Sequence, residues 1–383
     1  MSAQRLASMS PFHVMKLLAR ARELEAQGRS VVHMEIGEPD FITPAPVTDA
    51  GIRALQEGRT HYTAAAGLPE LRAAVARHYQ DRFGVRVDAR RILITPGASG
   101  ALQLILAALV DPGSEVLMAD PGYPCNRNFV YLFEGKPVMI PVGPEQDYQL
   151  SAAALESRWS ERSCCVMLAS PSNPTGTVVT RTVLQDMLAL VRERSAALIV
   201  DEIYQHLHYH GRPETALALG EDLFVINSFS KYFGMTGWRL GWLVAPEAFV
   251  EPLDMLAQNL FLAAPTPAQY AALAAFTPPV QEILEQRRLE FQRRRDYLLP
   301  ALRQLGFVIP VEPQGAFYLY ADCSRFTGDS FAFATDLLEQ AGVAITPGTD
   351  FGHYRAGQHV RFAYTTSMDR LQQGVQRLAE FIS

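Results

Sequence analysis

One lysine in this sequence stands where a reactive amine is expected. Lys231 lies in a loop of small and aromatic residues, 228–241, which follows the apolar segment 223–227. An isolated lysine is most often a solvated surface group. A lysine that is partly removed from water has a lowered pKa, however, and its neutral amine can act as a nucleophile. The position of Lys231 directly after an apolar segment therefore makes it a candidate for covalent chemistry.

An acid and a tyrosine follow another apolar segment. Asp201 comes directly after residues 196–200, and Tyr204 lies three positions further on. A carboxylate at the end of an apolar strand is costly to bury unless it meets a positive partner. An aspartate at a strand end is also a frequent helix cap. The residues alone therefore leave two interpretations of Asp201 open, a buried acid with a positive partner and a helix cap.

Other loops after apolar segments carry groups that suit a planar, phosphorylated molecule. The turn 95–102 is rich in small residues, which lets backbone N–H groups approach an anion at a helix N-terminus. Tyr123 lies in a proline-framed loop and could stack on a ring, while prolines on either side hold Asn173 as a hydrogen-bond donor. Each also has an ordinary interpretation: a tight turn with an N-cap serine, a core or surface tyrosine, and an Asn-Pro turn. None has the spacing of a dinucleotide or ATP loop.

Together these loops supply a lysine amine, a buried acid, a tyrosine hydroxyl, an asparagine amide, a stacking ring and a phosphate cradle. Ser228, Ser230 and Arg239 add donors for a phosphate group. Pyridoxal 5′-phosphate requires this combination, because the lysine forms a Schiff base with it and the acid keeps its pyridine nitrogen protonated. No single loop is specific, but the whole set at successive strand ends predicts a pyridoxal-phosphate site.

The elements that must position these loops alternate along the chain. Apolar segments of four to six residues, bounded by Gly, Pro, Asp or Ser, alternate with helical stretches. Strands that are apolar on both faces belong in a sheet covered by helices on both sides, so the alternation indicates a mostly parallel α/β sheet. Ligands of such sheets bind beyond the carboxyl ends of the strands. The predicted strands are 91–94, 115–119, 164–169, 196–200, 223–227 and 242–245, with a helix over 101–110.

The C-terminal part of the chain has a different order of elements. A charge-rich helical stretch at 280–302 precedes short strands at 315–320, 343–345 and 360–363, with helices over 331–341 and from Met368. This order predicts a smaller α+β domain, against which a helix over 13–27 could pack. We therefore predict a large cofactor-binding domain over residues 46–276 and a small domain that combines residues 1–45 with 277–383.

Composition limits the classes of protein that remain. The length of 383 residues suggests roughly two to three domains. A net charge of −6 disfavours nucleic-acid binding, which needs a concentrated positive field. No apolar run approaches the roughly 18 residues of a membrane-spanning helix. The four cysteines include no C-x-x-C pair and no secretory signal is evident, so we expect no metal site and a cytoplasmic location.

Segment 228–241 resembles the lysine signature of the class I/II aminotransferases, which are pyridoxal-phosphate enzymes of fold type I. That signature is S-x-S-K with an arginine eight residues after the lysine, matched by Ser228, Ser230, Lys231 and Arg239. Residues 35–41 (EIGEPDF) resemble the family's N-terminal G-E-P-D-F segment, and the similarity covers nearly the whole chain. The resemblance implies an α/β fold-type-I transferase whose large domain has a mostly parallel sheet covered by helices, beside a smaller α+β domain.

The resemblance also implies a role for each candidate residue. Lys231 would hold the cofactor and then act as general acid/base, and Asp201 would pair with the pyridine nitrogen. Tyr62 fits the tyrosine that reaches the cofactor phosphate of the partner subunit, which implies a homodimer with shared sites. Arg361 fits the arginine that binds the substrate α-carboxylate, together with Gly37 and Asn173. The other implied cofactor contacts are Gly97, Ala98, Ser99, Ser228, Ser230 and Arg239 at the phosphate, Tyr123 on the ring, and Asn173 and Tyr204 at the phenolic oxygen.

The implied activity is transfer of an amino group between an L-amino acid and a 2-oxo acid. Aspartate-specific members of the family supply a further cation for the distal carboxylate, but segment 258–266 contains no Arg or Lys and Ser99 stands where some relatives have lysine. A carboxylate without a cation in an apolar pocket loses solvation. Neutral or aromatic donors are therefore expected to be favoured over aspartate. Phe12, Phe41, Ile42 and Phe261 are candidates either for an apolar side-chain pocket or for plain core.

Three alternatives remain open. A β-elimination lyase acting on sulfur amino acids could use the same fold and cofactor. An aspartate aminotransferase remains possible if an arginine such as Arg127 or Arg22 reaches the distal carboxylate. A regulatory sensor would need a DNA-binding module, for which the residues before the large domain offer no basic helix pair.

Overall fold

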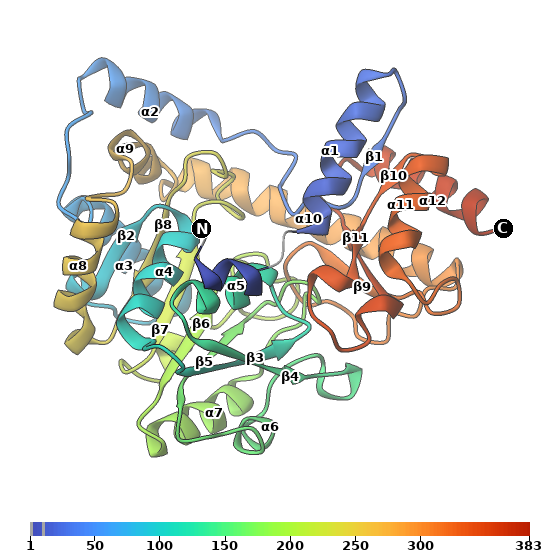
Figure 1. Cartoon of the computed structure of the whole chain (residues 1–383). Helices are drawn as coiled ribbons and strands as arrows, with labels where there is room; N and C mark the ends of the chain where they lie inside the picture. The colour runs from blue at the N-terminus through green and yellow to red at the C-terminus, as the bar shows by residue number, and fades with distance from the viewer. Residues whose placement is uncertain (1–2, 10–11) are drawn as a thin grey trace.

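The computed structural model describes residues 3–9 and 12–383. A seven-stranded sheet forms the centre of the larger part of the molecule, and a smaller part gathers the N-terminal helix and the C-terminal elements (Figure 1). The strand order is β2-β8-β7-β6-β5-β3-β4, and all neighbours are parallel except those of β8, which runs antiparallel to β2 and β7. The strands are β2 (Ile92–Thr95), β3 (Glu115–Asp120), β4 (Lys136–Pro141), β5 (Ser163–Ala169), β6 (Ala197–Asp201), β7 (Phe224–Ser228) and β8 (Gly241–Val244).

The central sheet is buried on both faces, as its apolar strands require. Alternate residues of each strand belong to different apolar clusters: Ile199 packs with the helices α4 and α8, whereas Leu198 and Val200 pack with α3 and α7. The mostly parallel, doubly covered α/β sheet is therefore confirmed. The helices of this larger part are α2 (Ala45–Gln56), which packs on α9, and α3 (Pro69–Phe83), α4 (Gly97–Leu109), α5 (Pro124–Leu132), α6 (Ala152–Glu156), α7 (Arg181–Glu193), α8 (Glu247–Leu260) and α9 (Thr266–Ala274).

Two features of the sheet differ from the sequence-based expectation. Strand β4 was not predicted, because its sequence KPVMIP contains two prolines and is only partly buried. It pairs only with β3 at the edge of the sheet, where prolines are tolerated. The helix expected over 101–110 starts earlier, at Gly97, so the turn of small residues is itself the first turn of α4.

The smaller part combines both ends of the chain. Strands β9 (Tyr318–Asp322), β11 (Thr346–Pro347) and β12 (His359–Ala363) form an antiparallel sheet in the order β11-β12-β9. Strand β1 (Val32–His33) pairs with β10 (Val343–Ala344). Helix α1 (His13–Ala26) contacts β10, β11 and α11, as expected for the helix predicted over 13–27. The remaining helices are α10 (Pro278–Gln304), α11 (Ser330–Ala341) and α12 (Met368–Ile382).

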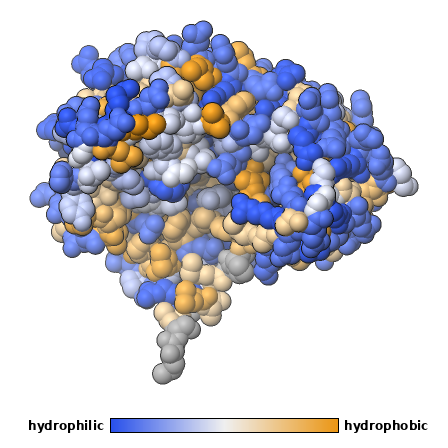
Figure 2. Space-filling model, turned by 90° about the horizontal axis from the view of Figure 1, so that it is seen from above, coloured by the Kyte–Doolittle hydropathy of each residue, from blue (hydrophilic) through white to orange (hydrophobic). Residues whose placement is uncertain are grey.

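The surface is mainly hydrophilic, but separate apolar patches interrupt it on the side where α2 lies (Figure 2). Several large apolar side chains of α2, of α8 and of the loops beside them are exposed, namely Ile52, Leu55, Tyr62, Met255, Leu260 and Leu262. No helix in the described part of the chain combines the length and the apolar character needed to cross a membrane.

Candidate active site

A pocket of about 370 Å³ lies at the carboxyl ends of the central strands, between the two parts of the molecule. Residues from β6, β7 and α4 form one side of it, and residues from α1, β11 and β12 form the other. Most of the residues singled out from the sequence for the cofactor and the substrate meet here. Those lining the pocket are Gly37, Ala98, Ser99, Tyr123, Asn173, Asp201, Tyr204, Ser228, Ser230, Lys231, Arg239 and Arg361.

Lys231 enters the pocket from the loop after β7. Its neighbours Phe229 and Phe233 are buried in the core, and Met235 N donates to Phe229 O at 3.0 Å, which closes the loop. The Lys231 Nζ donates to the Gly37 carbonyl at 2.7 Å. Burial lowers the pKa of Lys231 to about 8, against a smaller opposing effect of the Glu38 carboxylate. A substantial fraction of this amine is therefore neutral near physiological pH.

Asp201 ends β6 inside the pocket. It is 6% exposed, and its Oδ1 accepts from Ile203 N at 3.0 Å. Burial raises the pKa of the Asp201 carboxyl to about 6, while that backbone hydrogen bond and the charge of Lys231 lower it. Turns and no helix follow β6, so the alternative reading of Asp201 as a helix cap is wrong.

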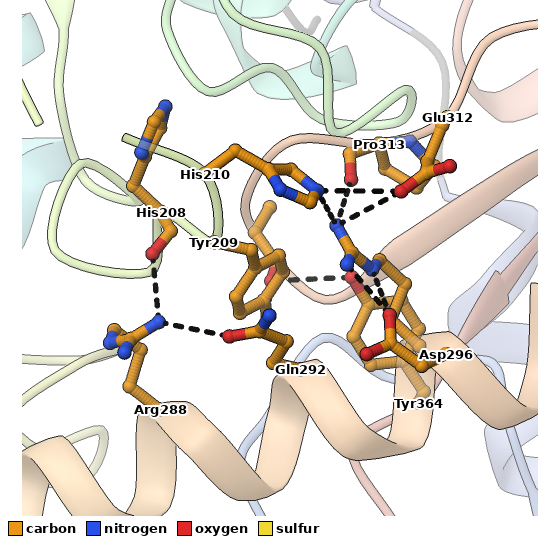
Figure 3. Close-up of polar contacts among 11 residues, drawn as sticks. His208, Tyr209, His210, Arg288, Gln292, Asp296, Glu312, Pro313 and Tyr364 are labelled. Carbon is orange, nitrogen blue, oxygen red and sulfur yellow. Dashed lines mark hydrogen bonds and ion pairs between the residues drawn. The ribbon is translucent and has the colours of Figure 1, made fainter. Parts of the chain in front are cut away.

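The loop that carries Tyr204 is fixed at its far end by α10 (Figure 3). Arg288 donates to the His208 carbonyl at 3.0 Å, and Arg295 donates to the Pro313 carbonyl at 2.9 Å and contacts the His210 ring. The Tyr209 hydroxyl donates to the Ala316 carbonyl. These contacts join the loop after β6 to the segment that leads into β9.

Tyr204 and Arg361 share a partner that the sequence analysis did not identify. The hydroxyls of Tyr204 and Tyr318 lie 2.8 Å apart, and the Tyr318 ring lies 4.2 Å from the Arg361 guanidinium carbon. A side chain at Gly37 would overlap the Tyr318 hydroxyl, so only glycine fits there. The sequence predicts only a strand over 315–320, because nothing in the spacing of these residues relates them to Tyr204; the strand observed there, β9, begins at Tyr318.

Arg361 is a buried cation whose hydrogen-bond partners are all neutral. It is 5% exposed, and its Nη1 donates to Asn173 Oδ1 at 2.8 Å. Its Nη2 donates to the Glu35 carbonyl at 2.5 Å and to Thr346 Oγ1 at 3.1 Å, while Nε is buried without a partner. A buried guanidinium favours an anion within reach, and a carboxylate matches its planar geometry.

The first turn of α4 and the loop after β7 form an anion cradle. Helix α4 begins at Gly97 with no side-chain cap, so the expected N-cap serine is not found, and Ala98 and Ser99 line the pocket. A Cβ at Gly97 would lie 2.6 Å from Arg239 Nη2, so a side chain there would displace the guanidinium. Ser228 Oγ donates to Ser230 Oγ at 2.9 Å beside them. A helix start, hydroxyls and a guanidinium together suit a phosphate group.

Some expected residues do not reach this pocket. Tyr62 is 82% exposed and lies outside it. Of the four candidates for an apolar pocket only Phe12 lines it, because Phe41 packs on Phe291 in the core and Ile42 is 83% exposed. Phe261, the fourth candidate, also packs on the core. Neither Arg22 nor Arg127 lines the pocket, and Arg127 Nη2 donates to the Asp350 carbonyl at 3.1 Å.

The arrangement fits pyridoxal phosphate. The start of α4 lies beside Arg239, and a lysine with a lowered pKa and a buried carboxyl line the same pocket. Tyr123 stands at the start of α5 and is 40% exposed, which leaves its ring accessible to a planar ligand. The pocket also contains groups that the sequence analysis missed, namely Val14, Met15, Glu35, Ile36, Glu38, Thr236, Tyr318, Thr346, Asp350 and Phe351.

Known proteins resemble this chain over its whole length. The model of the family described as aminotransferase class I and II matches residues 29–378. The chain is 38% identical to a valine–pyruvate aminotransferase of Mycobacterium tuberculosis, covering 98% of this chain and 97% of that protein. It is 34% identical to an aspartate aminotransferase of Bacillus sp., covering 99% and 98%. A crystal structure of an aminotransferase from Mycobacterium tuberculosis superposes with a TM-score of 0.96 at 38% identity, covering 100% of this chain and 99% of that one.

Proposed function

Since the chain belongs to the class I and II aminotransferase family and is a pyridoxal-phosphate-dependent transaminase, we propose that neutral or aromatic amino acids are its preferred donors. We further propose that the pocket described above is its active site. The bound cofactor supplies a carbonyl group that condenses with amines and a ring that accepts electrons. The residues of this chain bind, orient and exchange protons around it.

The position of each residue in the pocket supports the catalytic role proposed for it. Lys231 holds the cofactor and then moves the proton at the substrate Cα, because its lowered pKa lets the amine both accept and return a proton near neutral pH. The Asp201 carboxylate would pair with the pyridinium nitrogen. Asn173 and Tyr204 would donate to the phenolic oxygen, and the hydrogen bond between Tyr204 and Tyr318 would orient Tyr204.

Binding roles follow in the same way. The start of α4 at Ala98 and Ser99 and the side chains of Ser228, Ser230 and Arg239 would hold the phosphate, and Tyr123 would stack on the ring; all of these residues line the pocket. The substrate α-carboxylate is bound by Arg361, beside Gly37 and Asn173, because this buried guanidinium has only neutral partners. Every amino donor and every 2-oxo acid acceptor carries an α-carboxylate, so Arg361 would serve all of them.

The donor preference rests on one observation about charge. Among the described residues that line the pocket, the only Lys and Arg side chains are Lys231, Arg239 and Arg361, and each already has a role. The apolar side chains of Phe12, Val14 and Met15 form another part of the wall. An aspartate side chain would lose solvation there without meeting a free cation, whereas an apolar side chain gains about 1.5–3 kcal/mol on burial.

A panel of donors with one fixed 2-oxo acid tests this preference. We expect kcat/KM for methionine, leucine or phenylalanine to exceed that for aspartate by more than about tenfold. Burial in the pocket stabilises an apolar side chain, whereas the aspartate carboxylate loses solvation there. Aspartate as the best donor would refute the preference, and loss of that lead in Arg127→Ala would identify the hidden cation. Release of pyruvate and ammonia from cysteine, in the absence of any acceptor, would instead indicate β-elimination.

Replacement of Arg361 by lysine tests the assigned carboxylate site. We expect the KM values of all amino acids and 2-oxo acids to rise alike, because all share the α-carboxylate. Loss of the bidentate contact costs about 1.5–3 kcal/mol, or roughly 10- to 150-fold. The exposed Arg355, which pairs with Asp322 at 2.8 Å, provides the control Arg355→Lys, for which KM should stay unchanged. An effect of Arg361→Lys confined to acidic substrates would assign Arg361 to the side-chain carboxylate.

We also propose a homodimer in which Tyr62 contacts the phosphate bound by the partner subunit. The support is that Tyr62 is 82% exposed and that further apolar side chains of α2 and α8 are exposed near it in the fold. The division into a large domain, 46–276, and a small domain formed by 1–45 with 277–383 is also a proposal, supported by the separation of the seven-stranded sheet from the two smaller sheets. A cytoplasmic location is likewise proposed from the sequence alone.

A further inference from the structure

The first turn of α1 is held by an acid from the other end of the chain. Phe12 precedes the helix and its side chain accepts no hydrogen bond, so α1 has no side-chain cap of its own. Asp350 takes this place: Oδ1 accepts from His13 N at 2.8 Å and Oδ2 accepts from Val14 N at 2.9 Å. The carboxylate satisfies two donors that a helix start leaves unpaired, and its charge interacts favourably with the helix dipole.

Asp350 is fixed against the segment around Tyr123. It is 2% exposed, and its backbone carbonyl accepts from Arg127 Nη2 at 3.1 Å, on α5. The next residue, Phe351, accepts from Gly122 N at 2.8 Å through its carbonyl. The backbone at Asp350 and Phe351 is therefore hydrogen-bonded to the segment that carries Tyr123.

The turn that Asp350 holds forms part of the pocket. Phe12, Val14 and Met15 line it, together with Asp350 and Phe351. Val14 is bonded to Asp350 directly, and Phe12 and Met15 are the neighbours of the bonded residues in sequence. The Asp350 carboxylate thus contributes to the position of these apolar side chains relative to Tyr123, together with the packing of α1 on β10, β11 and α11.

We propose that Asp350 is a positioning residue for recognition of the substrate side chain. By holding the first turn of α1 against the pocket, it places the apolar wall that large neutral donors contact. The inference rests on the proposed function, because it assigns the wall of Phe12, Val14 and Met15 to the donor side chain. Asp350 itself does not contact the reacting atoms in this proposal.

The chain contains a matched control for the capping interaction. Asp329 caps α11 with the same chemistry, accepting from Phe331 N at 3.0 Å and Ala332 N at 3.1 Å through Oδ1. Asp329 does not line the pocket. Loss of either cap should lower the melting temperature, but only loss of the cap on α1 should change substrate selectivity.

The experiment compares the holoenzymes of the wild type, Asp350→Ala, Asp350→Asn and Asp329→Ala. KM and kcat are measured for alanine, leucine, methionine and phenylalanine with one saturating 2-oxo acid, beside the visible absorption of the bound cofactor. For Asp350→Ala we expect KM of the three large donors to rise about tenfold and KM of alanine to change less than about twofold, since each buried methylene contributes roughly fourfold. We expect kcat and the cofactor spectrum to stay unchanged, and Asp350→Asn to shift KM less in the same direction. For Asp329→Ala we expect unchanged KM values.

Two results would overturn the inference. One is an equal rise of KM for alanine and phenylalanine in Asp350→Ala, and the other is a lowered melting temperature without any change in KM, as expected for Asp329→Ala. If Asp350→Ala does not fold, the smaller change in Asp350→Asn decides by the same criteria. A wild type that prefers aspartate refutes the proposed donor preference, and the comparison of small with large neutral donors still tests Asp350.

Discussion

Replacement of Lys231 by alanine is expected to abolish transamination while cofactor binding persists. Loss of the general acid/base alone lowers the rate by roughly 10²- to 10⁴-fold, and loss of the covalent attachment adds to this. The proposed phosphate-binding residues at the start of α4 and at Ser228, Ser230 and Arg239 are unchanged, so the variant should still bind pyridoxal phosphate. Steady-state turnover and equilibrium binding of the cofactor measure the two effects separately.

The pH dependence of cofactor incorporation gives a second readout for Lys231. Only the neutral amine is nucleophilic, and burial lowers the pKa of Lys231 from its ordinary value of 10.5 to about 8. The rate of incorporation into cofactor-free wild type should therefore rise as the pH is raised through about 8. The visible band of the lysine-bound cofactor reports this rate, and Lys231→Ala should show no such band.

The chain offers simple controls for this experiment. It has only two other lysines, Lys16 and Lys136, and both are exposed. Lys16→Ala and Lys136→Ala should keep wild-type turnover and the wild-type spectrum. Near-normal turnover in Lys231→Ala would show that the central assignment is wrong.

Replacement of Asp201 by asparagine or alanine should slow the reaction much more than it weakens the fold. Removal of one preorganised charge at a reacting centre typically costs roughly 10²- to 10³-fold in rate. Here the charge proposed to be stabilised is that of the pyridinium nitrogen. The rate of the half-reaction between the holoenzyme and an amino donor measures the loss, with cofactor affinity determined in parallel.

Although the Asp201 variants should react more slowly, their stability without cofactor should not fall. The pKa of Asp201 is raised in the fold from 3.8 to about 6, so the folded protein binds the proton more tightly than the unfolded chain. Stability from this group is therefore lost as the pH rises from about 4 to about 6, and at pH 7 the buried charge is unfavourable. Asp201→Asn should leave the melting temperature of the cofactor-free protein at pH 7 unchanged or raised.

The neighbouring Glu202 provides the control for a buried acid without a place in the pocket. It is 2% exposed and accepts from Ala216 N at 2.6 Å, and it does not line the active-site pocket. Glu202→Gln should change stability but leave the half-reaction rate near that of the wild type. An unchanged rate with a lowered melting temperature in Asp201→Asn would make Asp201 a structural residue.

Local sequence determined the class of fold and most of the site of this protein. Each central strand is apolar throughout because it is buried on both faces, so residue type alone indicated β5, β6 and β7. Asp201 ends β6, while Asn173 and Lys231 lie in the loops after β5 and β7, and the carboxyl ends of parallel strands meet at one edge of a sheet. The chemistry in those loops therefore had to converge, whatever the packing of the remaining chain.

Tertiary structure alone decided which distant side chains complete that site. Tyr318 lies on a strand of the smaller part, and its contacts with Tyr204 and Arg361 depend on how that part packs against the central sheet. Asp350 caps a helix that begins 337 residues before it, which no local pattern can indicate. Periodicity and loop composition act over a few residues, so they fix elements and strand-end chemistry. Contacts between segments far apart in sequence arise only when the elements pack, and these contacts determine how Tyr204 is oriented and where the wall of Phe12, Val14 and Met15 lies.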